Sequence, residues 1–270
     1  TIVAALSLRG FTEVLNAFLL PRTPREFIII TQLLLTVYLI RHGIEPTARI
    51  SEILAPILVV PVLAMYLISL TRANFTELLP VFNAPIKEMA LGSLTATTAF
   101  LGFEILLIIS PYMKRPEMGQ RAISISVATI ILFYLFIVII VFTTIGVEDT
   151  KLMLWPAMSI IRTIKAPGRV FERLDALALA LWSIAAFTTI NGYYYSAVIS
   201  CAHIKKNREF KMYVAILFPW IYFISMLPRN VLESSAWLAK LGIFGTIPAL
   251  IIPVLVLLIN AFTKKDKKTA

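Results

Sequence analysis

Apolar stretches as long as a membrane-spanning helix alternate with short polar segments along the whole chain. A helix needs about 20 apolar residues to cross the hydrocarbon core of a bilayer. The pattern lacks the short alternating segments that are typical of a membrane β-barrel. We therefore predict an all-α, polytopic membrane protein that forms a single transmembrane domain over residues 1–270. The eight predicted helices span residues 1–20, 26–42, 50–71, 89–113, 121–146, 173–203, 210–227 and 237–263.

Two connections between the predicted helices are long, namely residues 72–88 and 147–172. In the second, apolar residues recur at helical spacing between Lys151 and Lys165. This pattern predicts an amphipathic helix that lies in the membrane interface. A loop packed over the mouth of the helix bundle accounts for the same residues equally well, and both interpretations can hold together.

Composition supports the membrane class. Hydrophobic residues make up 59% of the chain and charged residues only 15%, whereas soluble domains carry about 25% charged residues. The formal net charge is +10, but the basic residues cluster between apolar spans. We therefore attribute them to membrane topology and anionic lipid headgroups rather than to nucleic acid. The single cysteine, Cys201, cannot form an internal disulfide, and no Cys/His metal spacing is present, so we expect no metal site.

Basic residues are unevenly divided between the two sides of the predicted bundle, and the richer side is expected to be cytoplasmic. On this rule the first predicted helix runs from inside to outside, residues 147–172 are extracytoplasmic, and the basic tail 264–270 is cytoplasmic. The richer side carries Arg41, Arg49, Lys114, Arg115, Arg121, Lys205, Lys206, Arg208, Lys211, Lys264, Lys265, Lys267 and Lys268.

The helix predicted over residues 89–113 carries the strongest candidate for a solute site. An ionisable residue inside the hydrocarbon is costly and marks a functional site by default, and discontinuous helices bind solute in secondary transporters. We predict a break between Gly92 and Gly102. In the alternative interpretation, the threonines bond to carbonyls of their own helix and Glu104 pairs with a neighbouring helix. The candidate ligand-binding residues here are Thr95, Thr97, Thr98, Phe100, Gly102 and Glu104.

Two other predicted helices carry polar residues. Arg9 and Glu13 have the i,i+4 spacing of a pair on one helix face; the pair either staples two helices together or lines a solute path. Arg9 is also a candidate partner for Glu104, although Glu13, its neighbour on the same helix, competes with Glu104 for Arg9. Thr188 and Asn191 are candidates for ligand binding, or for hydrogen bonds that hold helices together. The three tyrosines that follow, residues 193–195, must point in three directions.

Several sequence blocks resemble the spore germination permease family. The most specific are FERLDAL, within GRVFERLDALALALW (168–182), and FLLPRTP (18–24). The resemblance covers essentially the whole chain, with the blocks in the same order as in the family. The further blocks are FTTINGYYYSA (187–197), RHGIEPTARISEILAPI (41–57), LLPVFNAPIK (78–87) and FLGFEILLIISPYM (100–113).

The resemblance implies a fold and a location for the site. Members are permease-like B subunits of spore germinant receptors, in the amino acid–polyamine–organocation superfamily. The implied fold is LeuT-like, with ten helices in two inverted repeats, and the eight visible helices correspond to the third through the tenth. The chain is thus expected to be N-terminally truncated, with the first two helices missing. Solute binds between the broken first and sixth helices of that fold, and residues 89–113 correspond to the sixth. The third and eighth helices flank the site, which adds Glu13, Thr188 and Asn191 to the expected ligand-binding residues.

What the resemblance implies about function is the sensing of a small amino-acid germinant, such as L-alanine, in the spore inner membrane. The expected partners are an A subunit and a lipoprotein C subunit of the receptor, and the lipid bilayer, but no nucleic acid. An ion-coupled amino-acid transporter, with Glu104 as a proton site, is the first alternative, and a non-binding scaffold subunit is the second. No nucleophile elbow or phosphate loop is found, so we expect neither an enzyme nor a cofactor.

Overall fold

The computed structural model describes residues 1–80, 84–102, 104–113, 115–163, 174–204, 210–246, 251, 254–257 and 259. Helices and turns, without strands, form these ranges. A helix overlaps each of the eight segments that were predicted to be helical, although α3 begins at Ile44 and α11 at Val231, six residues before the predicted starts. The helices are α1 (Ile2–Phe18), α2 (Arg25–Ile40), α3 (Ile44–Ser69), α4 (Ile86–Ala96), α5 (Ile105–Ile109), α6 (Gly119–Ile145), α7 (Val147–Leu152), α8 (Pro156–Thr163), α9 (Leu174–Ile204), α10 (Phe210–Met226) and α11 (Val231–Thr246).

Three helical stretches among the described residues are long and apolar enough to cross a membrane. They are Ile44–Arg72, Gly119–Ile145 and Ala176–Ile204, and Phe210–Met226 is a shorter apolar helix. The all-helical architecture and these three stretches agree with the predicted membrane protein. The first of them continues through Pro56 and Pro61 without a break in the helix.

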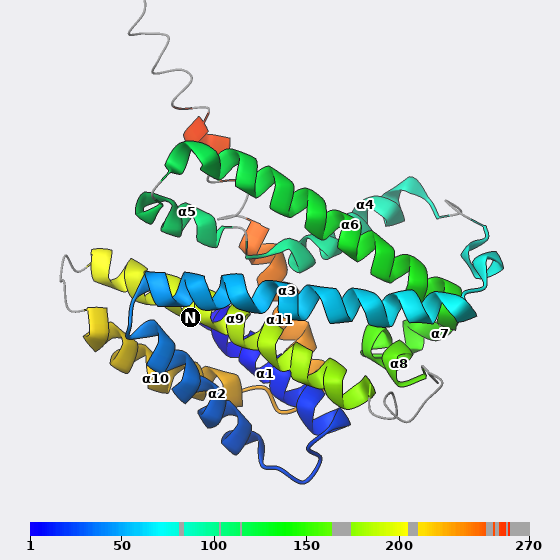
Figure 1. Ribbon diagram of the computed structural model, residues 1–270, viewed down its shortest axis with the longest axis horizontal. Helices are drawn as coiled ribbons and strands as arrows, with labels where there is room; N and C mark the ends of the chain where they lie inside the picture. Colours follow the sequence, from blue (N-terminus) through cyan, green and yellow to red (C-terminus); the bar gives the residue numbers. More distant parts are fainter. Residues whose placement is uncertain are drawn as a thin grey trace, which may run out of the picture.

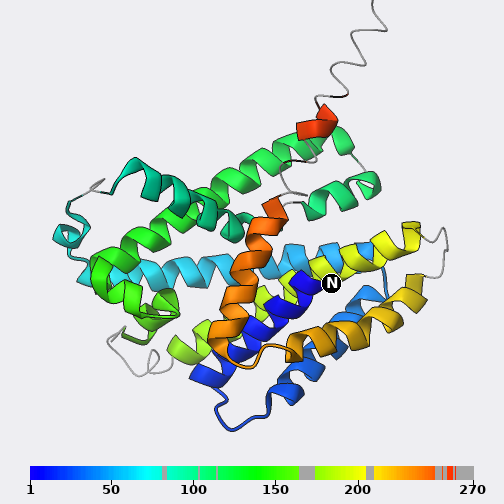
Figure 2. The same cartoon turned by 180° about the vertical axis from the view of Figure 1, so that it is seen from behind.

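α1 occupies the centre of the helix assembly (Figure 1). It packs against α2, α9, α10 and α11, and Figure 2 shows α11 lying across it from behind. Its buried residues include the charged pair Arg9 and Glu13 and the hydroxyl of Thr12. A central helix that buries charged side chains is unusual, because such groups remain buried only when they are paired.

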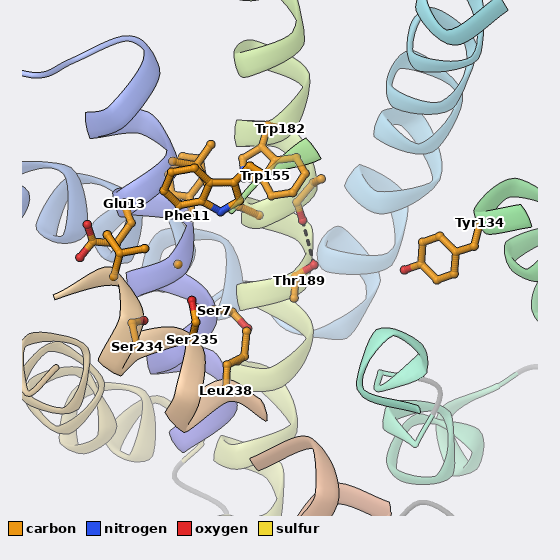
Figure 3. A pocket seen from close by; sticks show the side chains of 15 residues that line it. Ser7, Phe11, Glu13, Tyr134, Trp155, Trp182, Thr189, Ser234, Ser235 and Leu238 are labelled. Carbon is orange, nitrogen blue, oxygen red and sulfur yellow. Dashed lines mark hydrogen bonds between the residues drawn. The ribbon is translucent and has the colours of Figure 1, made fainter. Parts of the chain in front are cut away.

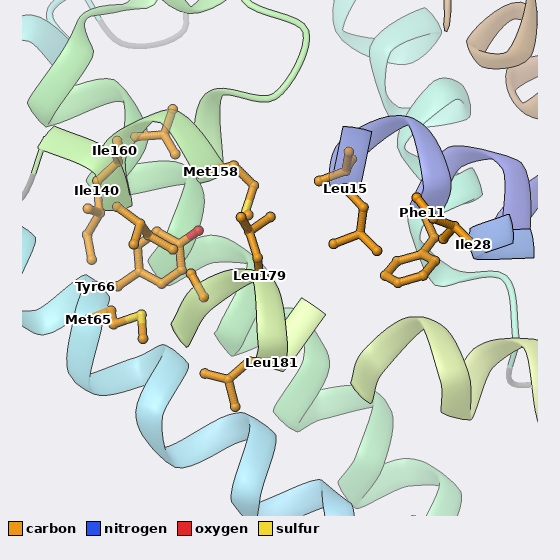
Figure 4. Packing of buried hydrophobic residues seen from close by; sticks show 14 residues of the cluster. Phe11, Leu15, Ile28, Met65, Tyr66, Ile140, Met158, Ile160, Leu179 and Leu181 are labelled. Carbon is orange, nitrogen blue, oxygen red and sulfur yellow. The ribbon is translucent and has the colours of Figure 1, made fainter. Parts of the chain in front are cut away.

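Two clusters of buried apolar side chains hold the helices together. In the first, Tyr66 of α3 packs with Met158 of α8 and Leu179 of α9 (Figure 4), and its hydroxyl donates a hydrogen bond to the carbonyl oxygen of Ala157 at 3.1 Å. In the second, α1, α2, α9 and α10 meet, and the hydroxyl of Tyr194 donates to the carbonyl oxygen of Val214 at 2.5 Å. Both phenols therefore find backbone partners on other elements.

Polar groups inside the helices are mostly satisfied within their own helix. Thr12, Thr36 and Ser69 each donate a hydrogen bond to the carbonyl oxygen four residues earlier. Such bonding suits a hydrocarbon environment, where no water is present to accept the hydrogen bond of a hydroxyl group. Conversely, apolar side chains such as Leu132 of α6 and Leu67 of α3 are 68% and 54% exposed, as is expected of surfaces that face lipid.

The long connection at residues 147–172 contains α7 and α8. α8 buries Met158, Ile160 and Ile161 and packs against α3, α6 and α9. Residues 164–172 lie outside the described residues. The extracytoplasmic position of this connection stays a prediction, as does the cytoplasmic position of the tail 264–270, which also lies outside them.

Candidate functional site

The helix predicted over residues 89–113 is broken in the structure. α4 ends at Ala96, a 3₁₀ helix covers Thr97–Phe100, and α5 begins only at Ile105. Between them, Gly102 has a φ of +123°, a conformation that glycine adopts readily and residues with a side chain rarely do. The predicted break is therefore confirmed.

Glu104 lies at this break, half-buried. Its Oε2 accepts a hydrogen bond from the backbone N–H of Gly102 at 2.6 Å, and its Oε1 accepts one from the hydroxyl of Tyr193 at 3.3 Å. Both partners are neutral. The contact considered between Arg9 and Glu104 is not formed, because Arg9 pairs with Glu13 instead. Glu104 is thus held by a neighbouring helix, but through a phenol rather than through a cation.

Tyr134 of α6 joins the break to a neighbouring cavity. Its hydroxyl donates a hydrogen bond to the carbonyl oxygen of Ala99 at 3.0 Å. Its ring meets that of Phe100 edge-on, with the ring centroids 5.5 Å apart. The backbone carbonyl of Ala99 and the backbone amide of Gly102 are therefore both engaged by side chains. A solute would reach the N–H of Gly102 only by displacing Glu104, whereas the carbonyl oxygen of Ala99 keeps a second acceptor position.

The cavity lies among α1, α6, α9 and α11 and has a volume of about 420 Å³. Pockets that bind small molecules span roughly 300–1,000 Å³. In Figure 3, Glu13 and Tyr134 lie at opposite ends of the lining, with Trp155 and Trp182 between them. Among the described residues that line it, Glu13 is the only charged one. The lining consists of Ser7, Phe11, Glu13, Val14, Tyr134, Trp155, Trp182, Ala185, Ala186, Thr189, Val231, Ser234, Ser235 and Leu238, together with Gly10.

Two arginines lie beside the carboxylate of Glu13. Its Oε1 lies 2.7 Å from Nε of Arg9, and its Oε2 lies 3.8 Å from Nη2 of Arg25. Arg9 is 1% exposed and Glu13 4%, whereas Arg25 is 40% exposed. Nη2 of Arg9 has no hydrogen-bond partner among the described residues. The expected pairing of Arg9 with Glu13 is therefore present, and it places a carboxylate at the wall of the cavity.

α9 presents one face to both the cavity and the break. Trp182, Ala185 and Thr189 line the cavity, at spacings of three and four residues that fall on one helix face. Tyr193, one turn beyond Thr189, lies on the same face and holds Glu104. The cavity and the broken helix are therefore neighbours along α9.

Thr188 and Asn191, the two residues of α9 that were expected to bind ligand, do not line the cavity. Thr188 donates its hydroxyl proton to the carbonyl oxygen of Ala185 at 2.9 Å. Asn191 is 1% exposed, and neither amide atom has a hydrogen-bond partner in the described part of the chain. A buried amide without partners costs free energy, about 1–3 kcal/mol for each unsatisfied group. The amide of Asn191 therefore remains a candidate for binding a polar group.

Part of the predicted site cannot be placed. The side chains of Thr95, Thr97 and Thr98 lie outside what the structure describes, although their backbone belongs to α4 and the 3₁₀ helix. Phe100, Gly102 and Glu104 lie together at the break, and Glu13 lies in the adjoining cavity. Residues 171–173, the first three of the FERLDAL block, are also outside the described residues.

Sequence reasoning did not single out several residues of the cavity wall. Ser234 and Ser235 lie in the first two turns of α11, where Asn230 Oδ1 accepts a hydrogen bond from the N–H of Glu233 at 2.8 Å and caps the helix. The signal in the sequence was this Asn-x-x-Glu start followed by two serines. Tyr134 gave no such signal, because it lies in an uninterrupted apolar helix.

The lining groups suit a small solute with one cationic and one apolar part. The carboxylate of Glu13 can accept hydrogen bonds from an ammonium group, because a carboxylate has about four acceptor positions and Arg9 occupies only part of them. The hydroxyls of Ser7 and Ser234 can donate or accept. The rings of Phe11 and Trp182 offer apolar contact, or a face for a cation.

Comparison with known proteins identifies relatives over most of the chain. A family model described as "Spore germination protein" matches residues 1–234. Spore germination protein YndE of Bacillus subtilis (strain 168) is 30% identical over 98% of this chain and 73% of its own length. Spore germination protein B2 of the same organism is 24% identical over 97% of this chain and 72% of its own, and spore germination protein A2 is 26% identical over 89% and 66%. No solved structure matches the chain.

Proposed function

This chain belongs to the spore germination protein family, and from that premise we propose that it is the permease-like subunit of a spore germinant receptor and binds the germinant. The germinant class is a small amino acid such as L-alanine. The proposed fold is the ten-helix, LeuT-like arrangement, with the break at Gly102 as the broken sixth helix. The proposal assigns the protein no enzymatic activity and no cofactor.

One observation carries the proposal. Glu13 is the single charged side chain among the described residues that line the cavity, and Tyr134 connects the cavity to the broken helix. A solute that enters beside Glu13 contacts Tyr134 or the face of α9 that holds Glu104. Its binding can therefore change the hydrogen bonds of Ala99 and Glu104, which is how occupancy of the cavity would reach the break.

The proposed setting follows from the family. We place the subunit in the spore inner membrane, with its C-terminus in the cytoplasm. We propose an A subunit and a lipoprotein C subunit as its partners. These assignments rest on the family and on the unequal division of basic residues, not on contacts within this chain.

Filling the cavity tests the proposal. Gly10 of α1 lines the cavity, and a Cβ atom added there meets no atom within 4 Å. We expect Gly10→Leu, in the full-length protein, to lose binding of labelled L-alanine, or of whichever amino acid the parent protein binds best. Gly10→Ala is the matched control, because its methyl group occupies little of the cavity and alanine favours a helix over glycine by about 1 kcal/mol.

The outcomes separate the candidate functions. Unchanged binding by Gly10→Leu would show that the cavity is not the site. Accumulation of labelled amino acid in vesicles that contain the protein alone would favour an ion-coupled transporter, which the carboxylate at a broken helix also suits. Absence of binding, with normal co-purification of the A and C subunits, would favour a scaffold.

A further inference from the structure

A second cavity, of about 400 Å³, lies between the end of α2 and the start of α10. This second cavity is separate from the cavity at Glu13. Glu13 lies beside Arg25 at the beginning of α2, whereas the second cavity lies beside Arg41, directly after the end of α2. α2 and α10 pack against each other, and Figure 1 shows the two helices side by side. The lining residues are Leu34, Val37, Tyr38, Arg41, His42 and Lys211.

One side of this cavity is basic. Arg41 and His42 directly follow α2, and Lys211 lies in the first turn of α10. Among the described residues that line the cavity there is no carboxylate, and the ion pairs found in the described ranges involve neither Arg41 nor Lys211. Two cations that line one cavity can bind an anion between them through charge-assisted hydrogen bonds.

His42 is fixed in place at the same rim. Its Nδ1 lies 2.7 Å from the backbone carbonyl oxygen of Tyr38. A carbonyl only accepts hydrogen bonds, so Nδ1 carries the proton and Nε2 is the ring nitrogen left for another partner. The imidazole also packs against the ring of Tyr38, with the ring centroids 4.9 Å apart.

The other side of the cavity is apolar and open. Leu34, Val37, Tyr38 and Arg41 recur at the spacings of one helix face, so a single stripe of α2 changes from apolar to basic along its length. Leu34 is 55% exposed and Tyr38 is 69% exposed. In a membrane, a stripe of this kind runs from acyl chains to headgroups, with the aromatic ring at the boundary between them.

We propose that this cavity binds an anionic phospholipid, with the phosphate between Arg41 and Lys211 and an acyl chain along Leu34 and Val37. Basic pockets between transmembrane helices on the cytoplasmic side are suited to lipid headgroups, and the distribution of basic residues places both cations on that side. A soluble phosphate would use the cations but not the apolar wall. The bound lipid would bridge α2 and α10 across their cytoplasmic ends.

The test is lipid retention by the purified full-length protein in detergent, measured by native mass spectrometry during titration with phosphatidylglycerol. We expect the double variant Arg41→Gln/Lys211→Gln to bind phosphatidylglycerol roughly 10- to 30-fold more weakly, since each basic residue near a membrane surface contributes about 1 kcal/mol. The matched control is Arg22→Gln/Arg229→Gln, which removes two exposed cations elsewhere. It should bind as the parent does, as should the charge-conserving variant Arg41→Lys/Lys211→Arg.

Two further arms distinguish the source of the phosphate. Phosphatidylcholine, which has no net charge, should be retained weakly by every variant. Inorganic phosphate should not displace phosphatidylglycerol at comparable concentration. Equal retention by the parent and Arg41→Gln/Lys211→Gln would overturn the proposal. Displacement by inorganic phosphate at the same concentration would overturn its assignment to a lipid.

Discussion

Leu101 packs so closely on Gly245 that a Cβ atom added to the glycine would lie 2.9 Å from Cδ2 of Leu101. Leu101 belongs to the break, and Gly245 lies near the end of α11, whose beginning lines the cavity. A second close approach lies on α9, where a Cβ atom at Gly192 would lie 3.1 Å from Cδ1 of Ile105. Leu101 in the break and Ile105 directly after it therefore pack against glycines of two different helices.

The first prediction is that Gly245→Ala alters the germination response. The added methyl group must displace the side chain of Leu101, which is a residue of the break. We expect a higher germinant concentration for half-maximal response in spores that carry the variant, with normal amounts of the subunit on immunoblots. The control is Gly92→Ala in α4, where a Cβ atom meets nothing within 4 Å. Equal responses of the two variants would argue against a role for the contact.

The second prediction concerns the hydrogen bond from Tyr134 to Ala99. Tyr134→Phe removes this bond but keeps the ring against Phe100, so the loss of stability should be about 1 kcal/mol. The control is Tyr66→Phe, which removes a bond of similar length to Ala157, away from the break. Thermal unfolding should show similar losses for both variants, while only Tyr134→Phe shifts the germinant dose–response. A shift in both, or in neither, would contradict the link between cavity and break.

The break was predictable from the sequence because its cause is local. Gly102 supplies the backbone freedom, and a carboxylate two residues later can bond to the N–H that the break releases. The same local reasoning identified Arg9 and Glu13, whose i,i+4 spacing is enough to bring them together. Contacts between residues within about one turn of the same helix can be predicted from the sequence.

The contacts between different helices were not predictable. Helical periodicity tells which side chains share a face of one helix, but not which other helix that face contacts. Tyr193, Tyr194 and Tyr195 point in three directions, as their succession requires, and reach Glu104, Val214 and Phe210 respectively. Nothing in the sequence assigns these destinations. For the same reason Thr188 was predicted to bind ligand in place of Thr189, although Thr189 is the residue that lines the cavity.

The third prediction is that Glu104→Gln lowers the response without removing the protein from the membrane. The amide oxygen can still accept from the N–H of Gly102, and the amide group can still reach Tyr193, so the local geometry should survive. Only the negative charge is lost. We expect a weaker germinant dose–response in spores at normal subunit level, whereas Glu117→Gln, at an exposed position, should behave as the parent. A normal response would make Glu104 a structural residue of the break.

The fourth prediction separates the structural role of Glu13 from its proposed role in binding. Glu13→Leu leaves the guanidinium of Arg9 buried without its ion-pair partner, which should cost about 3–5 kcal/mol of stability. The double variant Arg9→Met/Glu13→Leu removes both charges and should recover most of that loss, because apolar replacements of a buried pair are often neutral. Arg25 loses a partner in both variants, but it is 40% exposed and can be solvated. Thermal unfolding of the purified protein measures these differences.

If the carboxylate also binds the germinant, the double variant will be stable and present in spores at normal level, yet will not respond to the amino acid. A stable double variant with a normal dose–response would mean that the pair only joins helices, and the germinant would then have to be recognised by the hydroxyl and aromatic groups of the cavity.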